Sequence, residues 1–323
     1  MWKRTALLGV SVFILAVIVI YANPILIINS LQNANMTYIF LAFLVSCTAI
    51  LMRIIKWKVL LDGVSIKTAA PIQLFSTAAG NFTPGKIAEP IKAVLLKIKT
   101  GKNVSETLLS VIWERIIDVI ILIVFSIFIL SILTENLILA YAISLAIFII
   151  LVGLLFAFLF YRKIGKAVFN FIRKFSIFKK LPENFMDNFY NTKISKFKML
   201  QCFIITAILW VLEAVVYYFT FLALGYEIPI LVLVGMISLS LIIGIASSLP
   251  GGLGSTEIVL IMFLGIFGLG SVISTTGVFI ARLLSFWLVT FLGGISFLLL
   301  SRKINMKNLF GEPDNFTEGR KET

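Results

Sequence analysis

The sequence contains no histidine, and it contains only two cysteines, Cys47 and Cys202. The lack of histidine excludes histidine metal ligands and histidine-based catalytic relays. The two cysteines lie far apart in apolar stretches and lack a CxxC spacing, so we interpret them as packing residues rather than a disulfide or a metal site. We therefore expect neither a metal nor another cofactor.

Acidic residues are also scarce, because 15 Asp and Glu stand against 28 Lys and Arg and the formal net charge is +13. In a soluble protein this excess would suggest a nucleic-acid partner. Here 60% of the residues are hydrophobic and the mean hydropathy is +1.08, which excludes an ordinary soluble domain. We interpret the positive charge as a determinant of membrane orientation that faces anionic lipid, and we expect no nucleic acid as a partner.

Long apolar segments predict the membrane crossings, because a helix needs about 20 apolar residues to span a bilayer. We expect six crossings, at residues 5–22, 37–52, 107–133, 137–161, 199–224 and 272–301. On one side of the membrane the loops contain no Lys or Arg; these are 22–37, 134–136 and 225–229. The other side receives the basic N-terminus, the stretch 53–102, the loop 162–198 and the tail 302–323. By the positive-inside rule, the chain is a multi-pass protein of the cell membrane with both termini in the cytoplasm.

Two further segments, 71–92 and 230–270, are apolar but interrupted by Pro and Gly. The first begins and ends among Lys residues, so it forms either a re-entrant hairpin or a segment lying on the surface. The second is split at Pro250-Gly251-Gly252-Leu253-Gly254 and forms either two crossings or a re-entrant pair. Irregular backbone at membrane depth must be buried in protein or line a wet cavity. The fold class is thus an all-α polytopic membrane protein with about 6–8 transmembrane helices and one or two re-entrant Pro-Gly hairpins.

The order of the segments is that of an inverted repeat. Each half would consist of a crossing, a broken hairpin and a second crossing, and the two halves would run in opposite directions. Pro84 precedes Arg115 by 31 residues, and Pro250 precedes Arg282 by 32 residues. Paired interrupted segments of this kind indicate a transporter-type binding site. We therefore treat residues 1–301 as a single transmembrane domain.

The loop 162–198 contains ten Lys or Arg, with Phe and Ile interleaved at roughly helical spacing. It forms either amphipathic helices lying on anionic inner-leaflet headgroups or a solvated loop. The polar tail 302–323 is too short for a catalytic domain. The sequence neither requires nor excludes a homo-oligomer.

Ionisable residues inside apolar segments are the candidates for function, because charges at membrane depth are energetically unfavourable without partners or water. Glu114, Arg115 and Asp118 share one segment, where Arg115 and Asp118 lie one turn apart and could form only a structural ion pair. Glu213 and Arg282 lie in separate segments and could likewise form a buried pair that only joins two helices.

The functional alternative is that these residues bind a phosphate. Guanidinium groups bind phosphate through two parallel hydrogen bonds, and a helix that starts at Ser255-Thr256-Glu257, with a Ser or Thr cap, would add backbone donors. The carboxylates could bind a cationic headgroup or a coupling proton. No ATP-binding motif is visible, so transport would be downhill or ion-coupled.

Five motifs occur in order along residues 37–301. They are Arg53-x3-Trp57, Asn81-x2-Pro84-Gly85-x3-Glu89, Glu114-Arg115-x2-Asp118, Leu249-Pro250-Gly251-Gly252-Leu253-Gly254-x2-Glu257 and Arg282. Together they resemble the lysylphosphatidylglycerol synthase transmembrane-region family, in a stand-alone form without the aminoacyl-transfer domain. The resemblance implies a helical membrane fold with re-entrant hairpins, and movement of a lipid headgroup between leaflets. Where that family would have an Arg after Pro-Gly, this chain has Lys86, which cannot bind phosphate through a two-pronged guanidinium.

We therefore expect translocation of a phospholipid or polyprenyl-phosphate headgroup, with no catalytic residues. The alternatives are a membrane-embedded transferase or accessory subunit acting on a lipid-linked substrate, and a small-solute exporter. The predicted substrate-binding residues are Asn81, Pro84, Gly85, Glu89, Glu114, Arg115, Asp118, Glu213, Pro250, Gly251, Gly252, Gly254, Glu257 and Arg282.

Overall fold

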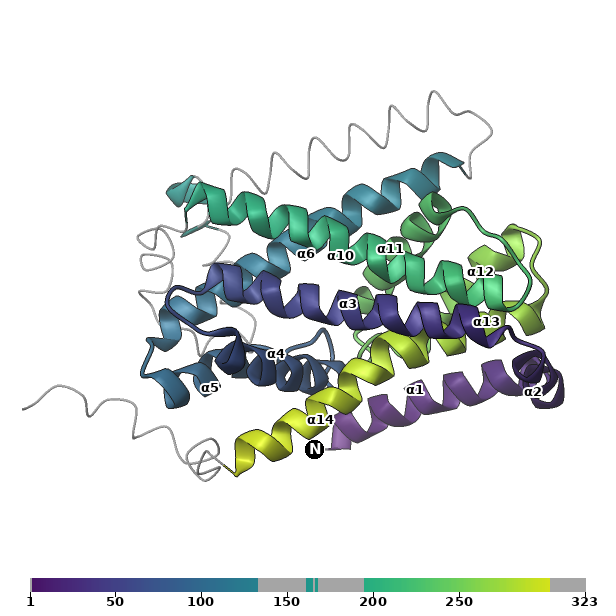
Figure 1. Ribbon diagram of the computed structural model, residues 1–323, viewed down its shortest axis with the longest axis horizontal. Coiled ribbons are helices and arrows are strands. Elements are labelled where there is room, and N and C mark those ends of the chain that lie inside the picture. Colours follow the sequence, from purple (N-terminus) through teal and green to yellow (C-terminus); the bar gives the residue numbers. More distant parts are fainter. Residues whose placement is uncertain (1, 133–160, 165, 168–194, 303–323) are drawn as a thin grey trace, which may run out of the picture.

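The computed structural model describes residues 2–132, 161–164, 166–167 and 195–302. Its described part is a bundle of helices without named strands (Figure 1). The helices are α1 (Trp2–Tyr21), α2 (Pro24–Gln32), α3 (Met36–Leu60), α4 (Ile66–Asn81), α5 (Ile91–Thr100), α6 (Val104–Ile132), α10 (Lys196–Ala223), α11 (Ile230–Ala246), α12 (Ser255–Ile266), α13 (Ser271–Arg282), the π-helical turn η1 (Leu283–Trp287) and α14 (Leu288–Ser301).

Several described helices can cross a membrane by length and composition. Three continuous ones pass this test, at Met36–Leu60, Phe197–Ala223 and Ser271–Ser301, and α1 with α2 could make a fourth span bent by 76°. The 29 residues of α6 are also long enough, although this helix carries four ionisable residues. The all-α membrane fold is therefore confirmed. The predicted crossing 137–161, most of the basic loop 162–198 and nearly all of the tail 302–323 lie outside the described residues.

Two helix boundaries differ from the prediction. Helix α3 continues to Leu60 instead of ending near residue 52, because Ile54, Trp57 and Leu60 keep its buried face apolar beyond Arg53. The predicted loop 22–37 contains the short helix α2. The Asn23 carboxamide accepts a hydrogen bond from the Ile25 N–H at 3.1 Å, and proline follows at the first helical position. This cap with an N-terminal proline is a known helix-start signal that the apolar pattern obscured.

Each broken segment forms two helices joined by a turn. The pair α4 and α5 lies toward one end of the bundle, and α11, α12 and α13 lie toward the other end (Figure 1). Packing between the halves is reciprocal: α4 packs on α14, α11 packs on α6, and α3 packs along α10. An inverted repeat predicts this exchange, in which the hairpin of each half packs on the last helix of the other.

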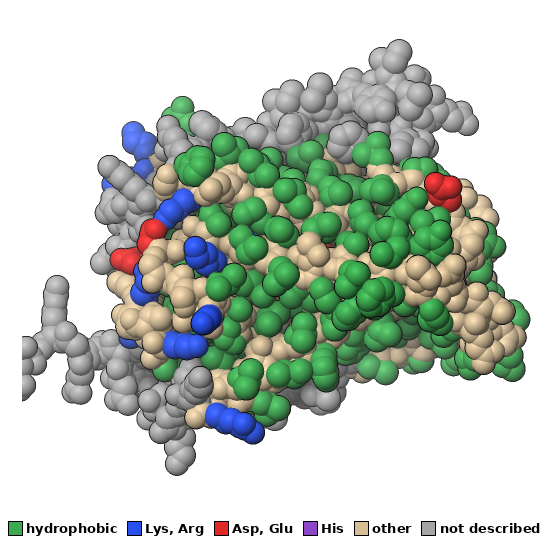
Figure 2. Space-filling model, viewed as in Figure 1, with side chains coloured by type: hydrophobic (Ala, Val, Ile, Leu, Met, Phe, Trp, Pro, Cys, Tyr) green, Lys and Arg blue, Asp and Glu red, His purple; other side chains and the backbone are tan. Residues whose placement is uncertain are grey.

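The surface matches a membrane environment. Figure 2 shows large apolar side chains over the middle of the molecule, while Lys and Arg gather at the end where α3 finishes and α5 lies. Exposed apolar residues on α3 and α14 include Phe40, Leu51, Phe291 and Leu298. Such a continuous apolar exterior is typical of contact with lipid rather than water.

Candidate binding site between the two broken helix pairs

The turns of the two broken helix pairs meet inside the protein. Pro84 and Pro250 form an antiparallel backbone bridge, so the interruption of one hairpin lies against the interruption of the other. Gly251 has a φ of +60°, and a Cβ there would lie 2.7 Å from the Asn81 carbonyl oxygen. Only glycine fits both this conformation and this close approach. The Pro-Gly breaks therefore let the two chains come together.

The same turns hold two non-glycine residues in the left-handed region, Lys86 with a φ of 58° and Ser248 with a φ of 56°. An L-amino acid in this conformation carries a strain of about 1–2 kcal/mol. Strained residues of this kind gather at functional sites, where the surrounding structure fixes them. The Lys86 backbone conformation thus marks the tip of the first hairpin as a candidate site.

Each half contains an equivalent ion pair between its hairpin and the helix that follows. The Arg115 guanidinium lies 2.8 Å from the Glu89 carboxylate, and the Arg282 guanidinium lies 2.5 Å from the Glu257 carboxylate. Arg282 also lies over the Phe286 ring, with its guanidinium carbon 4.4 Å from the ring centroid. In each half, the Glu that follows the Pro-Gly motif forms an ion pair with the Arg of the next apolar segment. The matching intervals in the sequence therefore correspond to matching ion pairs in the structure.

The start of α12 differs in one detail from the prediction. The helix begins at Ser255 as expected, but its N-cap is Gly254 rather than a Ser or Thr. The Glu257 carboxylate accepts a hydrogen bond from the Gly254 N–H at 2.7 Å. A side-chain carboxylate therefore already occupies part of this helix N-terminus, which leaves fewer backbone donors for a bound anion.

A buried network of opposite charges surrounds Glu114. Its carboxylate contacts the Lys92 ammonium directly and lies 3.4 Å from the Lys56 ammonium, which also lies 2.6 Å from Asp118. Arg115 Nη1 lies 3.4 Å from Asp118, so the predicted ion pair within α6 is present. Lys56 and Lys92 are 1% and 0% exposed. These two lysines therefore lie inside the protein rather than in a solvated loop.

The pairing of Glu213 also differs from the prediction. Its carboxylate accepts a hydrogen bond from the Arg53 guanidinium at 2.9 Å, which joins α3 to α10, whereas Arg282 pairs with Glu257. The Glu213–Arg282 pair is therefore wrong, because residue spacing does not show that α3 packs along α10 and brings Arg53 beside Glu213.

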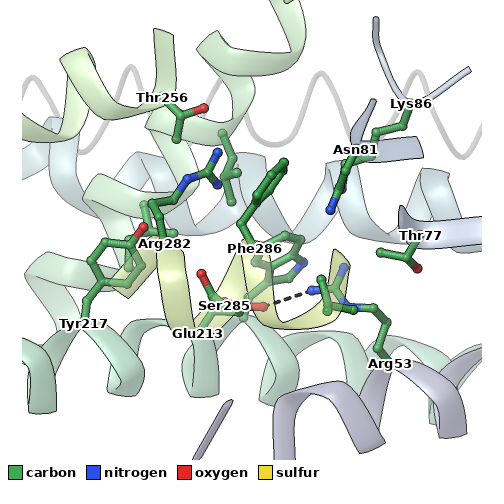
Figure 3. Close-up of a pocket in the computed structure, with 14 residues that line it drawn as sticks. Arg53, Thr77, Asn81, Lys86, Glu213, Tyr217, Thr256, Arg282, Ser285 and Phe286 are labelled. Atoms are coloured by element: carbon green, nitrogen blue, oxygen red, sulfur yellow. Dashed lines mark hydrogen bonds and ion pairs between the residues drawn. The ribbon is translucent and has the colours of Figure 1, made fainter. Parts of the chain in front are cut away.

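A small polar cavity of about 50 Å³ lies between these groups (Figure 3). Arg282 and Phe286 lie on one side and Asn81 and Lys86 on the other, while Arg53 and Glu213 approach from below in this view. The Asn81 amide donates a hydrogen bond to the Thr290 hydroxyl at 2.8 Å, which fixes the end of α4 against α14. We call this space the polar cavity.

A larger space of about 240 Å³ lies beside it, between α6 and α11. Apolar side chains and glycines form most of its walls, and Lys86, Arg115 and Asp118 supply its charges. We call it the apolar cavity. Lys86 lines both cavities, together with Trp210, Leu241 and Thr256. A molecule held there would meet a cationic group and an extended apolar wall at once.

The predicted site residues divide into three groups. Those that line a cavity are Asn81, Gly85, Arg115, Asp118, Glu213, Gly251, Gly252 and Arg282. A second group does not line the cavities. Glu89, Glu114 and Glu257 form ion pairs with cations of the site, and Pro84 and Pro250 form the bridge between the two turns. Gly254 faces Ile14 of α1, where an added Cβ would lie 2.8 Å from the side chain.

Four cationic residues at the site were not among the residues predicted from the sequence: Arg53, Lys56, Lys86 and Lys92. Isolated lysines flanked by apolar residues, as in Ile55-Lys56-Trp57 and Ile91-Lys92-Ala93, were the available signal. The Lys in place of the expected Arg at position 86 predicts the loss of a two-pronged phosphate contact and a changed headgroup preference, but not a position between two cavities.

Fold and site together define a multi-pass helical membrane protein whose two broken helix pairs meet at buried ionisable residues. The chain belongs to the family described as the lysylphosphatidylglycerol synthase TM region, whose sequence model matches residues 7–293. The family assignment made from the five motifs is confirmed.

The chain is also similar to several archaeal proteins. A UPF0104 membrane protein of Pyrococcus horikoshii is 27% identical over 94% of this chain and 98% of its own length. One of Methanothermobacter thermautotrophicus is 25% identical over 91% of this chain and 92% of its length. Another, of Methanocaldococcus jannaschii, is 24% identical over 94% and 97%. The chain therefore matches these membrane proteins along nearly their entire length.

Proposed function

We propose that this protein moves the phosphate-bearing headgroup of a membrane lipid between the two leaflets, without hydrolysing ATP itself. The observation that carries the proposal is the position of Lys86, whose side chain lines both the polar and the apolar cavity. A lipid has the same two parts, a charged phosphate and an apolar body. The family assignment agrees with a role that concerns lipids.

In this proposal the cation at the hairpin tip contacts the phosphate, while Arg53, Arg115 and Arg282 contribute positive potential from their ion pairs. The apolar cavity receives the part of the lipid next to the headgroup. Val119 on α6 and Ile245 on α11 line this cavity and are 45% and 44% exposed, so a route from the bilayer lies between these two helices.

The proposal includes an orientation. The basic end of the molecule and both termini would face the cytoplasm of the cell, because positive loops remain on that side. The loop 162–198 would contact anionic inner-leaflet headgroups.

Lipid movement can be measured with purified protein in vesicles that contain labelled phosphatidylglycerol. We expect the fraction of label reached by a membrane-impermeant quencher to rise above that in protein-free vesicles. The Lys86→Gln variant should slow this by about tenfold, since a hydrogen bond to a charged group contributes about 1.5–3 kcal/mol.

The matched control is Lys67→Gln, which removes an exposed lysine at the start of α4 outside both cavities. It should retain the wild-type rate. Absence of movement for every lipid tested would contradict transport, and a chemically altered lipid in mass spectra would indicate a transferase instead.

A further inference from the structure

The charges around the two cavities can be counted in pairs. Eleven charged side chains line the cavities or belong to ion-pair networks that include a lining residue, among the described parts of the chain. Six are cationic and five are carboxylates: Arg53, Lys56, Lys86, Lys92, Arg115 and Arg282 against Glu89, Glu114, Asp118, Glu213 and Glu257. Six minus five leaves one net positive charge.

Five of the cations are matched one-to-one with the five carboxylates. The matched pairs are Arg53 with Glu213, Lys56 with Asp118, Lys92 with Glu114, Arg115 with Glu89, and Arg282 with Glu257. Each carboxylate therefore has a cation in contact. Among the residues that the structure describes, these networks hold no further carboxylate for the sixth cation.

The sixth cation is Lys86. Within the described residues its ammonium forms no ion pair of 4.0 Å or less, although Glu89 lies near enough to interact through its charge. Its side chain is half-buried and faces both cavities. A single unmatched charge at membrane depth is unfavourable without water or a counter-ion. A ligand with one negative charge would make the site neutral.

We propose that the site is matched in charge to one phosphodiester monoanion, held at Lys86. This inference rests on the proposed function and adds the substrate class to it. A phosphomonoester carries about −1.5 to −2 charges near neutral pH, which would leave the site negative. A zwitterionic headgroup has no net charge and would leave Lys86 uncompensated. A diester lipid with an uncharged second substituent fits best.

Headgroup selectivity tests the proposal. Vesicles would carry trace labelled phosphatidylglycerol, phosphatidylcholine or phosphatidic acid, which are a monoanionic diester, a zwitterion and a monoester. We expect the wild type to move phosphatidylglycerol about tenfold faster than either of the others, the ratio given by one charge-assisted hydrogen bond. Equal rates, or a preference for the monoester, would overturn the charge matching while leaving lipid transport intact.

Two variants give a readout that a purely structural lysine would not change. Lys86→Gln makes the site neutral, so its preference should shift from phosphatidylglycerol to phosphatidylcholine. Lys86→Glu makes the site net negative and should favour a cationic phosphotriester lipid. Unchanged selectivity in both variants would contradict the assignment. Thermal unfolding in detergent should stay at the wild-type temperature for Lys86→Gln, because the side chain forms no ion pair within the described structure.

A soluble diester distinguishes a lipid from a small anion. Glycerophosphoglycerol carries the same headgroup without acyl chains, and it should compete poorly with labelled phosphatidylglycerol because it leaves the apolar cavity empty. Competition at the concentration of the lipid would overturn the lipid assignment in favour of a water-soluble anion. Failure of every lipid to move, in contrast, would contradict the proposed function itself.

Discussion

At the scale of single residues, the buried charges around Glu114 are the most consequential feature. Two ammonium groups depend on this carboxylate, and neither has appreciable contact with solvent. Lys92 also donates a hydrogen bond to the Gln73 side-chain oxygen at 3.0 Å and lies over the Trp57 ring. These neutral contacts position the ammonium but cannot neutralise it. The network is therefore sensitive to the loss of one charge.

Replacing Glu114 with Gln removes that charge and keeps the shape of the side chain. We expect the free energy of unfolding to fall by about 3–5 kcal/mol, since a buried cation is left without its partner. Thermal unfolding of the detergent-purified protein would show it. Glu106→Gln, at an exposed position in the same helix, is the control and should change little. Equal stability of the two variants would mean that Lys92 is neutral in the folded protein.

The sequence predicted the residues of α6 and the two hairpin motifs, because rare charges inside apolar runs are visible without a structure. It missed Lys56 and Lys92 for a physical reason. The positive-inside rule counts each Lys or Arg as a cytoplasmic loop residue. It cannot separate a lysine exposed in such a loop from a lysine that is buried against a carboxylate. Only the position of Glu114 across the bundle distinguishes the two cases.

At the scale of elements, α3 and α10 run side by side and are joined by one ion pair (Figure 1). The presence and the order of these helices were predictable from the length of the apolar segments in the sequence. The partner of Glu213 was not, because it depends on α3 packing along α10, two helices that lie far apart in the sequence. The π-helical turn η1, directly after Arg282, also lacked a sequence signal. Phe286, within this turn, lies beneath the Arg282 guanidinium.

Charge exchange tests this contact between elements. Arg53→Glu or Glu213→Arg alone would set like charges together between α3 and α10, so each should lower the thermal unfolding temperature. The double exchange should recover most of the loss. The comparison pair, Glu213→Arg with Arg282→Glu, should not recover, because those residues belong to different ion pairs. Recovery by that pair instead would contradict the observed partners.

At the scale of the whole molecule, the face in Figure 2 has apolar side chains over its middle and Lys and Arg gathered at one end. The basic end contains Lys67, whereas the loop between α10 and α11 at the opposite end contains Glu227 and no basic residue. This segregation is the global pattern that the sequence predicted best, since it depends on composition and not on side-chain contacts.

Single cysteines at these two positions can report orientation in cells. In a background with Cys47 and Cys202 replaced by Ala, Lys67→Cys should react with a membrane-impermeant maleimide only after permeabilisation. Glu227→Cys should react in intact cells. The reverse labelling would invert the proposed orientation, and labelling of both in intact cells would place both residues on the outer side of the membrane.

The reciprocal packing of α4 on α14 and α11 on α6 limits how the protein can move. If one half rocked as a rigid body, both contacts would have to separate together, because the hairpin of each half packs on the last helix of the other half. The Pro84–Pro250 bridge lies at the meeting point of the two interruptions and outside these two pairs of packed helices. We therefore expect a passage to open by rearrangement of these turns, with the interlocked helices acting as a stationary frame.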